Sequence, residues 1–256
     1  MIKGMQEVID IVARVKETFE NNGGLKQIVF VACGGSLSSS YPARYMLNAE
    51  SSTLRVLGYN SSEFVHATPK FVGKNTLVIA TSTKATQETV EAIETANAKG
   101  AVTIGLTGYS NSATAQTAQY SLTYYHSDDW YQDPTLVHCN SQGTALKLAF
   151  VLLKEFEGYA AYDKAMAAFE KLPTIYAKAY QDIKPVAVEF AMRYQNDEIW
   201  NALASGAMWE CAYSDAFCFF QEMQTVHCVP CHSGEYFHGA FETTDRNLAV
   251  LLMKSV

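Results

Sequence analysis

The hydrophobic pattern of the first half of the chain alternates between helical spacing and short, continuous apolar runs. Spacing of three or four predicts helices that include residues 8–19, 37–48 and 87–99. Continuous runs rich in β-branched residues predict strands at 27–32, 54–57, 76–80, 101–106 and 120–124. Such runs are typical of strands that are buried on both faces of a parallel sheet. The alternation predicts right-handed βαβ units and a doubly wound α/β domain.

From Ser141 onward the pattern changes to long helical stretches, over 146–156 and 159–172, which we expect Pro173 and Pro185 to interrupt. A second α/β unit follows, with strands predicted at 198–203, 225–229 and 248–253, a helix at 208–223 and a short helix near Glu235. We place the domain boundary near 175–185. The chain then divides into 1–180, a complete first domain with connecting helices, and 181–256, a partial second domain.

The second domain has few predicted strands compared with the ~5–6 of a typical sheet. We therefore expect it to be truncated at its C-terminus. An edge strand left unpaired there favours association with another chain.

Composition and charge restrict the function. The 256 residues are 48% hydrophobic, which indicates a globular chain, and the net charge of −7 argues against a nucleic-acid partner. No run approaches the ~20 apolar residues of a membrane span, and residues 1–7 lack a secretory signal. We expect a cytoplasmic protein that is not bound to a membrane. Its six cysteines are then expected to be reduced thiols.

Two turns rich in glycine and hydroxyl groups follow predicted strands and open predicted helices. The first is Cys33-Gly34-Gly35-Ser36, and the second is Thr81-Ser82-Thr83-Lys84-Ala85-Thr86. Ligands of open parallel sheets bind beyond the carboxyl ends of strands, and helix N-termini attract anions. Either turn alone is also explained by ordinary helix capping. Two such turns at neighbouring strand ends suggest one bound phosphate group. Neither turn has the glycine spacing or the lysine of a nucleotide-binding loop.

Residues 219–239 bring a carboxylate, a CxxC and three histidines into one apolar stretch. Glu222 and His238 are separated by a helix end, a strand and a Ser-Gly turn, lengths that let both side chains line one cleft. A carboxylate and a histidine suit proton transfer beside a sugar carbonyl. Taken alone, these residues are better explained as a solvated helix-end acid and a capped or buried histidine.

The sequence Cys228-Val229-Pro230-Cys231-His232 matches haem-attachment and thioredoxin-like patterns. Haem attachment belongs to exported chains, and a redox CxxC begins a helix rather than ending a strand. Zinc needs ligands on one side, whereas alternate residues of a strand face opposite ways. We expect no metal and no cofactor.

These motifs together resemble the sugar isomerase (SIS) domain family, which carries a C-G-x-S turn after one strand and S-x-S-G-x-T after another. The resemblance covers nearly the whole chain. It implies that a sugar phosphate is bound by Gly35, Ser36, Thr81, Ser82, Thr83 and Thr86. The chain departs from the pattern with threonine for serine at 81 and 83, Lys84 for glycine and Ala85 for glutamate. It keeps all three expected hydroxyl groups.

The resemblance also implies catalysis by Glu222 on the sugar carbons and by His238 in ring opening. The family places this histidine in the neighbouring subunit's site, which implies a homodimer or higher homo-oligomer. Glu235 and His227 are further candidates for substrate contact. The family's proline after His-Gly is Ala240 here.

Within the family, the segments Val31–Gly34, Thr86–Glu88 and Ser233–Gly239 are most similar to deglycases that cleave phosphorylated sugar–amine adducts such as fructoselysine 6-phosphate. An aldose–ketose isomerase and a non-catalytic sugar-phosphate sensor remain alternatives. A sensor predicts a DNA-binding segment, for which there is no room ahead of Ile28. Family members close a C-terminal segment over the sugar, so we expect this chain to bind ligand with little turnover.

Overall fold

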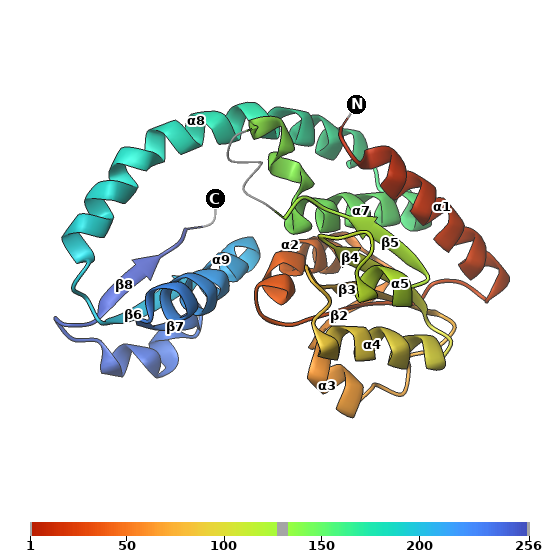
Figure 1. Ribbon diagram of the computed structural model, residues 1–256, viewed down its shortest axis with the longest axis horizontal. Coiled ribbons are helices and arrows are strands. Elements are labelled where there is room, and N and C mark those ends of the chain that lie inside the picture. Colours follow the sequence, from red (N-terminus) through yellow and green to blue (C-terminus); the bar gives the residue numbers. More distant parts are fainter. Residues whose placement is uncertain (1, 127–132, 255–256) are drawn as a thin grey trace. The chain divides into compact units, whose positions relative to one another are not determined.

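A computed structural model describes residues 2–126 and 133–254 of the protein. The chain forms two compact units, Met1–Tyr176 and Ala177–Val256, and the boundary between them falls inside a long helix. Each unit has its own sheet, and every paired strand in both sheets is parallel (Figure 1). The predicted α/β class with parallel sheets is confirmed.

The first unit is built on a sheet with strand order β2-β1-β3-β4-β5. Its strands lie at the places that the apolar runs predict. Their bounds are β1 Gln27–Ala32, β2 Arg55–Asn60, β3 Thr76–Thr81, β4 Val102–Thr107 and β5 Tyr120–Thr123. The central strands are buried along almost their whole length, which explains why their sequences are continuously apolar.

The helices of the first unit are α1 Met5–Asn21, α2 Gly34–Glu50, α3 Ser61–His66, α4 Gln87–Ala98, α5 Ala113–Thr117, the 3₁₀ helix η1 Pro134–Cys139, and α7 Ser141–Glu157. The sequence analysis missed α3 and α5, because helices this short carry little periodicity. Side-chain caps mark both of them. Asn60 accepts a hydrogen bond from the Ser62 backbone, and Ser112 accepts one from the Ala115 backbone.

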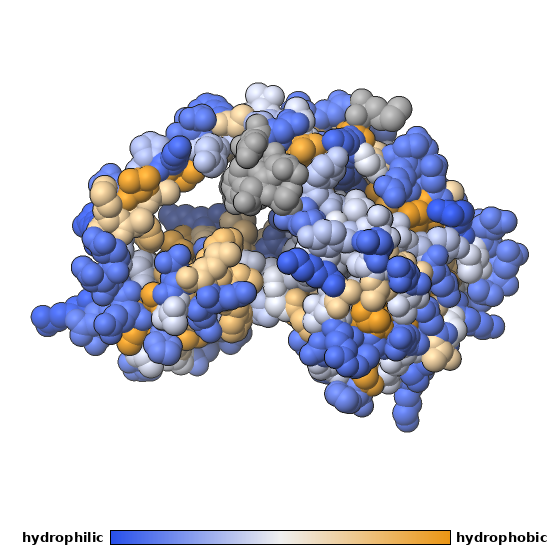
Figure 2. Space-filling model, viewed as in Figure 1, coloured by the Kyte–Doolittle hydropathy of each residue, from blue (hydrophilic) through white to orange (hydrophobic). Residues whose placement is uncertain are grey.

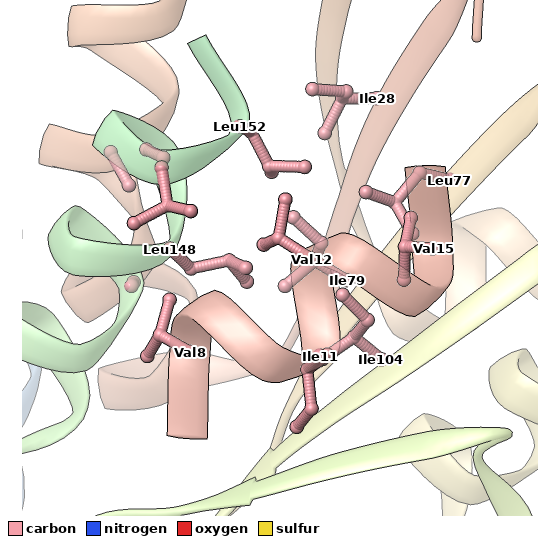
Figure 3. Packing of buried hydrophobic residues seen from close by; sticks show 14 of the residues in the cluster. Val8, Ile11, Val12, Val15, Ile28, Leu77, Ile79, Ile104, Leu148 and Leu152 are labelled. Carbon is pink, nitrogen blue, oxygen red and sulfur yellow. The ribbon is translucent and has the colours of Figure 1, made fainter. Parts of the chain in front are cut away.

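Helices cover both faces of this sheet and place its core in two layers. On one face Val8, Val12 and Val15 of α1 pack with α7 residues against the strands (Figure 3). On the other face Ile93 of α4 packs against Val78 and its neighbours. The sheet is therefore held between two apolar layers, which make it a rigid support for the turns at its edges.

The long helix α8, Tyr162–Tyr194, continues through Pro173 and Pro185. The predicted interruption at these prolines is wrong. A proline removes one backbone donor and disturbs one turn, and the helix continues where its other hydrogen bonds remain. Proline therefore did not mark an element boundary in this segment.

The second unit contains a sheet with strand order β7-β6-β8. Its elements are β6 Ile199–Ala204, the 3₁₀ helix η2 Gly206–Met208, α9 Trp209–Ser214, the π-helix η3 Asp215–Met223, β7 His227–His232, the 3₁₀ helices η4 Tyr236–His238 and η5 Ala240–Thr243, and β8 Ala249–Leu252. The segment 208–223 is helical throughout, as predicted, but its helical type changes from 3₁₀ to α and then to π along the segment. π-Helical turns are rare and are frequent at functional sites.

The second unit and the adjoining part of α8 expose many apolar side chains. Phe237 is 74% exposed and Met223 is 66% exposed. Apolar residues also gather on the surface of the C-terminal half of α8 (Figure 2). Despite this apolar surface, none of the helices in residues 2–126 and 133–254 combines the length and the hydrophobicity that crossing a bilayer requires.

Candidate active site

The strand order of the first unit places a topological switch point at the carboxyl ends of β1 and β3. The chain leaves β1 toward β2 on one side, and β3 lies on the other side of β1. Ala32 at the end of β1 pairs with Thr81 at the end of β3. The two turns that the sequence analysis singled out therefore follow adjacent strand ends. Open α/β sheets bind ligands at this topological switch point.

The first turn presents open backbone and an unused hydroxyl group. Cys33 is the extended residue before α2, Gly34 has a positive φ of 53°, and Gly35 is exposed. The Ser36 carbonyl accepts bonds from the Ser39 and Ser40 hydroxyls, both at 3.0 Å. The Ser36 hydroxyl itself bonds to none of the described residues. A half-buried free hydroxyl at a helix N-terminus is a ready donor to an anion.

Ser82 shapes the second turn from inside. Its hydroxyl oxygen accepts a hydrogen bond from the Thr86 backbone N–H at 2.8 Å and donates to the Thr86 hydroxyl at 3.1 Å. Ser82 is buried, whereas Thr86 is exposed. The hydroxyl group of Ser82 thus forms hydrogen bonds within the turn, whereas Thr86 is exposed to solvent. That either residue contacts the ligand stays a prediction.

Thr81 and Thr83 differ in how their hydroxyls are used. The buried Thr81 hydroxyl has no hydrogen-bond partner among the described residues. The Thr83 hydroxyl lies 2.9 Å from the Tyr124 hydroxyl. An unsatisfied buried hydroxyl costs about 1–3 kcal/mol, which a ligand oxygen would relieve.

Tyr124 is a further candidate for the site, which the sequence alone did not indicate. It is buried just after β5, and burial raises the pKa of its hydroxyl, so the group stays protonated near neutral pH. Tyr124 can therefore donate to Thr83 and leave the Thr83 proton for a ligand. No motif marks Tyr124 in the sequence, where it is the last residue of a predicted strand.

Ala85 adopts a left-handed conformation with φ of 73°. For a residue with a Cβ this conformation costs roughly 1–2 kcal/mol. Backbone strain of this kind persists where the surrounding structure enforces it, and it concentrates at functional sites. The neighbouring Lys84 is exposed. The strain lies in the turn that carries four of the predicted phosphate-binding hydroxyls.

Glu222 lies on the last turn of η3 and is exposed. The helix ends when Thr225 enters the left-handed region with φ of 59°, and Val226 N–H donates to the Phe220 carbonyl at 2.9 Å. A left-handed residue after a helix end is usually glycine, so threonine in this conformation is unusual. The turn fixes the end of the helix that carries Glu222. It also explains why β7 begins later than predicted.

His238 ends the short helix η4, and its backbone N–H donates to the Glu235 carbonyl at 2.9 Å. Both side chains are exposed, as is that of His227 at the start of β7. Within residues 2–126 and 133–254, no hydrogen bond or ion pair joins Glu222 to His238. Their meeting in one cleft therefore stays a prediction, as do the roles of Glu235 and His227.

The CxxC lies wholly inside β7, so its cysteines are on a strand rather than at a helix N-terminus. Burial raises the pKa of Cys228 to about 11 and also raises that of Cys231. Thiols with raised pKa values stay protonated and react slowly. Among the described residues, no group of three or more His, Cys, Asp or Glu side chains is arranged to hold a metal.

Glu210, in the first turn of α9, is a buried carboxyl group that the sequence analysis did not single out. Burial raises its pKa from the usual 4.5 to about 8. In the unfolded chain the Glu210 carboxyl group ionises near pH 4.5. Its contribution to folding stability is therefore fully present below about pH 4.5 and is lost as the pH rises toward 8.

We predict that Glu210→Gln flattens this pH dependence. The variant should gain stability on the order of 1–3 kcal/mol at pH 8 relative to the unmodified chain, because no buried charge forms. Urea unfolding at pH 5 and pH 8 measures it, with the exposed Glu198→Gln as the matched control. An equal pH slope in the Glu210 and Glu198 variants would contradict the prediction.

Comparisons with known proteins agree with this geometry. Residues 25–152, which contain both turns, match the SIS domain family. The fructosamine deglycase FrlB of Bacillus subtilis (strain 168) is 34% identical over 230 residues, 90% of this chain and 69% of that protein. The fructoselysine 6-phosphate deglycase of Escherichia coli O157:H7 is 23% identical over 237 residues, 90% of this chain and 65% of the relative.

A solved structure from Salmonella typhimurium LT2, assigned as a phosphosugar isomerase, superimposes with a TM-score of 0.92 at 33% identity. The alignment covers 100% of this chain and 76% of that one. The chain thus spans about two thirds to three quarters of these relatives. The resemblance inferred from the two turns is confirmed, and the chain belongs to the SIS domain family, among relatives named deglycases and phosphosugar isomerases.

Proposed function

We propose that this protein cleaves a phosphorylated sugar–amine adduct, of the fructoselysine 6-phosphate type, into a hexose 6-phosphate and an amine. One observation carries the phosphate part of this proposal. Two hydroxyl-bearing turns follow the paired ends of β1 and β3, with Ser36 and Thr81 holding hydroxyl groups that no described residue uses. The choice of an adduct rather than a free sugar is supported by the names of the two sequence relatives.

The chemistry needs a base beside the carbon that carries the amine. Glu222 would remove a proton from that carbon of the open-chain ketosamine, giving an enaminol. Returning the proton to the former carbonyl carbon gives an imine, and water then divides the imine into an aldose phosphate and a free amine. His238 would move the proton of the ring oxygen during ring opening. Histidine suits this task because its ordinary pKa is ~6.5.

We also propose that a second copy of the chain completes the site. Glu222 and His238 are both exposed and make no hydrogen bond or ion pair with each other among the described residues, so a shared site would bring His238 from another protomer. The exposed apolar residues of the second unit, Phe237 and Met223 among them, support association between copies.

We expect hexose 6-phosphates to raise the melting temperature of the protein, and the unphosphorylated hexoses to leave it unchanged. Ligand at 100 times its Kd adds about 2.7 kcal/mol of stability, which corresponds to roughly 5–10 °C for a chain of this size. Differential scanning fluorimetry measures the shift. Ser36→Ala combined with Thr83→Ala should abolish it.

The matched control for this prediction is Thr18→Ala combined with Thr68→Ala, which removes two hydroxyls far from the turns in sequence. These hydroxyls bond the Arg14 and Phe64 carbonyls. The control should keep the phosphate response. Equal shifts from glucose and glucose 6-phosphate would refute phosphate recognition by the turns.

The alternative function is that of an aldose–ketose phosphosugar isomerase. The 33% identity to the Salmonella typhimurium structure favours this alternative. Both reactions begin with the same proton removal beside a carbonyl. Chromatographic separation of the products followed by mass spectrometry distinguishes them. Incubation with phosphorylated fructose–lysine should release lysine if the protein is a deglycase, and interconversion of fructose 6-phosphate and glucose 6-phosphate indicates an isomerase.

A further inference from the structure

A pocket lies in the first unit, between the start of α1, the end of β5 and the start of α7. Its volume is about 210 Å³. Lys3, Tyr125, Thr144 and Lys147 contribute polar side chains to its wall. None of the predicted phosphate-binding residues of the two turns lines it. The pocket is thus a separate site in the molecule.

Lys147 is the feature that makes this pocket unusual. Its side chain is 2% exposed, and its ammonium group donates to the Lys3 backbone carbonyl at 2.9 Å. The ammonium nitrogen also lies 3.5 Å from His138 Nδ1. Both acceptors are neutral, since burial and the nearby Lys147 charge lower the pKa of His138. No carboxylate forms an ion pair with Lys147 among the described residues.

A buried ammonium group without a counter-charge is unfavourable. Buried charges are ordinarily paired, because neutral hydrogen-bond acceptors do not replace the lost hydration. Burial accordingly lowers the pKa of Lys147. The protein keeps a lysine here although an apolar side chain would fill the core at lower cost. A negative ligand in the adjoining pocket would supply the counter-charge that none of the described residues provides.

The rest of the wall favours a small anion. The Lys3 ammonium lies 4.7 Å from the centre of the Tyr125 ring, so a second positive charge borders the pocket. Glu7 is the carboxylate in the lining and is exposed to solvent. The hydroxyls of Tyr125 and Thr144 are available as donors to an oxyanion. A volume of 210 Å³ exceeds the ~30 Å³ of a water molecule several-fold and suits an oxyanion of a few heavy atoms.

We propose that this pocket binds a small oxyanion, a carboxylate or inorganic phosphate, on the Lys147 ammonium group. The site is independent of the sugar-phosphate site at the β1 and β3 turns. It would also fix the N-terminal segment, because Lys147 already holds the Lys3 carbonyl.

The test is a titration of lysine-¹³C-labelled protein with acetate in one arm and inorganic phosphate in the other. The Lys147 Cε signal, identified by its loss in Lys147→Gln, should shift saturably. Its titration midpoint should rise as the anion binds. The Ser36→Ala and Thr83→Ala double variant should keep this response, which separates the pocket from the phosphate turns and from any failure of the proposed function.

A second variant, Lys3→Gln, tests the same pocket if the Lys147→Gln protein does not fold. It removes an exposed positive charge from the pocket wall. It should weaken anion binding about threefold or more. Lys74→Gln, at an exposed lysine that does not line the pocket, is the matched control and should leave binding unchanged. A response to acetate, to phosphate or to both supports the site and identifies the anion class. The absence of a saturable Lys147 shift with either anion overturns the proposal.

Discussion

Glu222→Gln is expected to lower deglycase turnover by about 10²–10⁴-fold, the usual contribution of a general acid or base. Glutamine keeps the shape of the side chain and removes its ability to carry a proton. The fold should be unaffected, because Glu222 is exposed and makes no hydrogen bond to another described residue. Release of free amine from a phosphorylated fructosamine measures the effect. Binding of hexose 6-phosphate should stay close to normal, since the phosphate turns are unchanged.

His238→Asn provides the second half of this test. If both residues serve one transition state, the double variant should lose less activity than the product of the single losses. The exposed Glu242→Gln, in η5, is the matched control and should keep its activity. Mixing the inactive Glu222→Gln and His238→Asn proteins should restore part of the activity if protomers share sites. Full activity of Glu222→Gln alone would remove the residue from the mechanism.

Gly143→Ala is expected to destabilise the first unit by about 2–3 kcal/mol, the upper part of the range for overpacked cores. Gly143 lies in the first turn of α7, where its N–H donates to the capping Asn140 side chain at 2.8 Å. A Cβ at this position would lie 2.3 Å from the His138 carbonyl oxygen. That oxygen belongs to the backbone, so η1 or α7 must shift to make room. Urea unfolding followed by circular dichroism measures the loss.

Gly58→Ala is the matched control for steric contact. Its Cβ would meet the Arg44 guanidinium at an even shorter 1.8 Å, yet this group is the far end of a flexible side chain. Arg44 can swing away at low cost, so we expect a change of less than about 1 kcal/mol, within the range of mild substitutions. Equal losses in the two variants would contradict the packing of η1 against α7.

The sequence was informative wherever burial alone determines residue type. The strands of the first sheet were predicted from continuous apolar runs, and the core residues of α1 from their helical spacing, because both faces of this sheet are covered. It was less informative in segments with weaker packing. Pro173 and Pro185 do not interrupt α8, and the segment before β7 is partly a π-helix.

The sequence by itself therefore determined the α/β class and the two hydroxyl turns, since these depend on local composition and on the period of the apolar residues. Tertiary structure decided which parts meet. Pairing of Ala32 with Thr81 placed the turns at adjacent strand ends on one edge of the sheet, and packing after β5 brought Tyr124 to Thr83. The burial of Lys147 beside the Lys3 carbonyl likewise joins residues far apart in the chain. No local pattern records such contacts, because strand order and helix packing arise from burying the whole apolar surface at once.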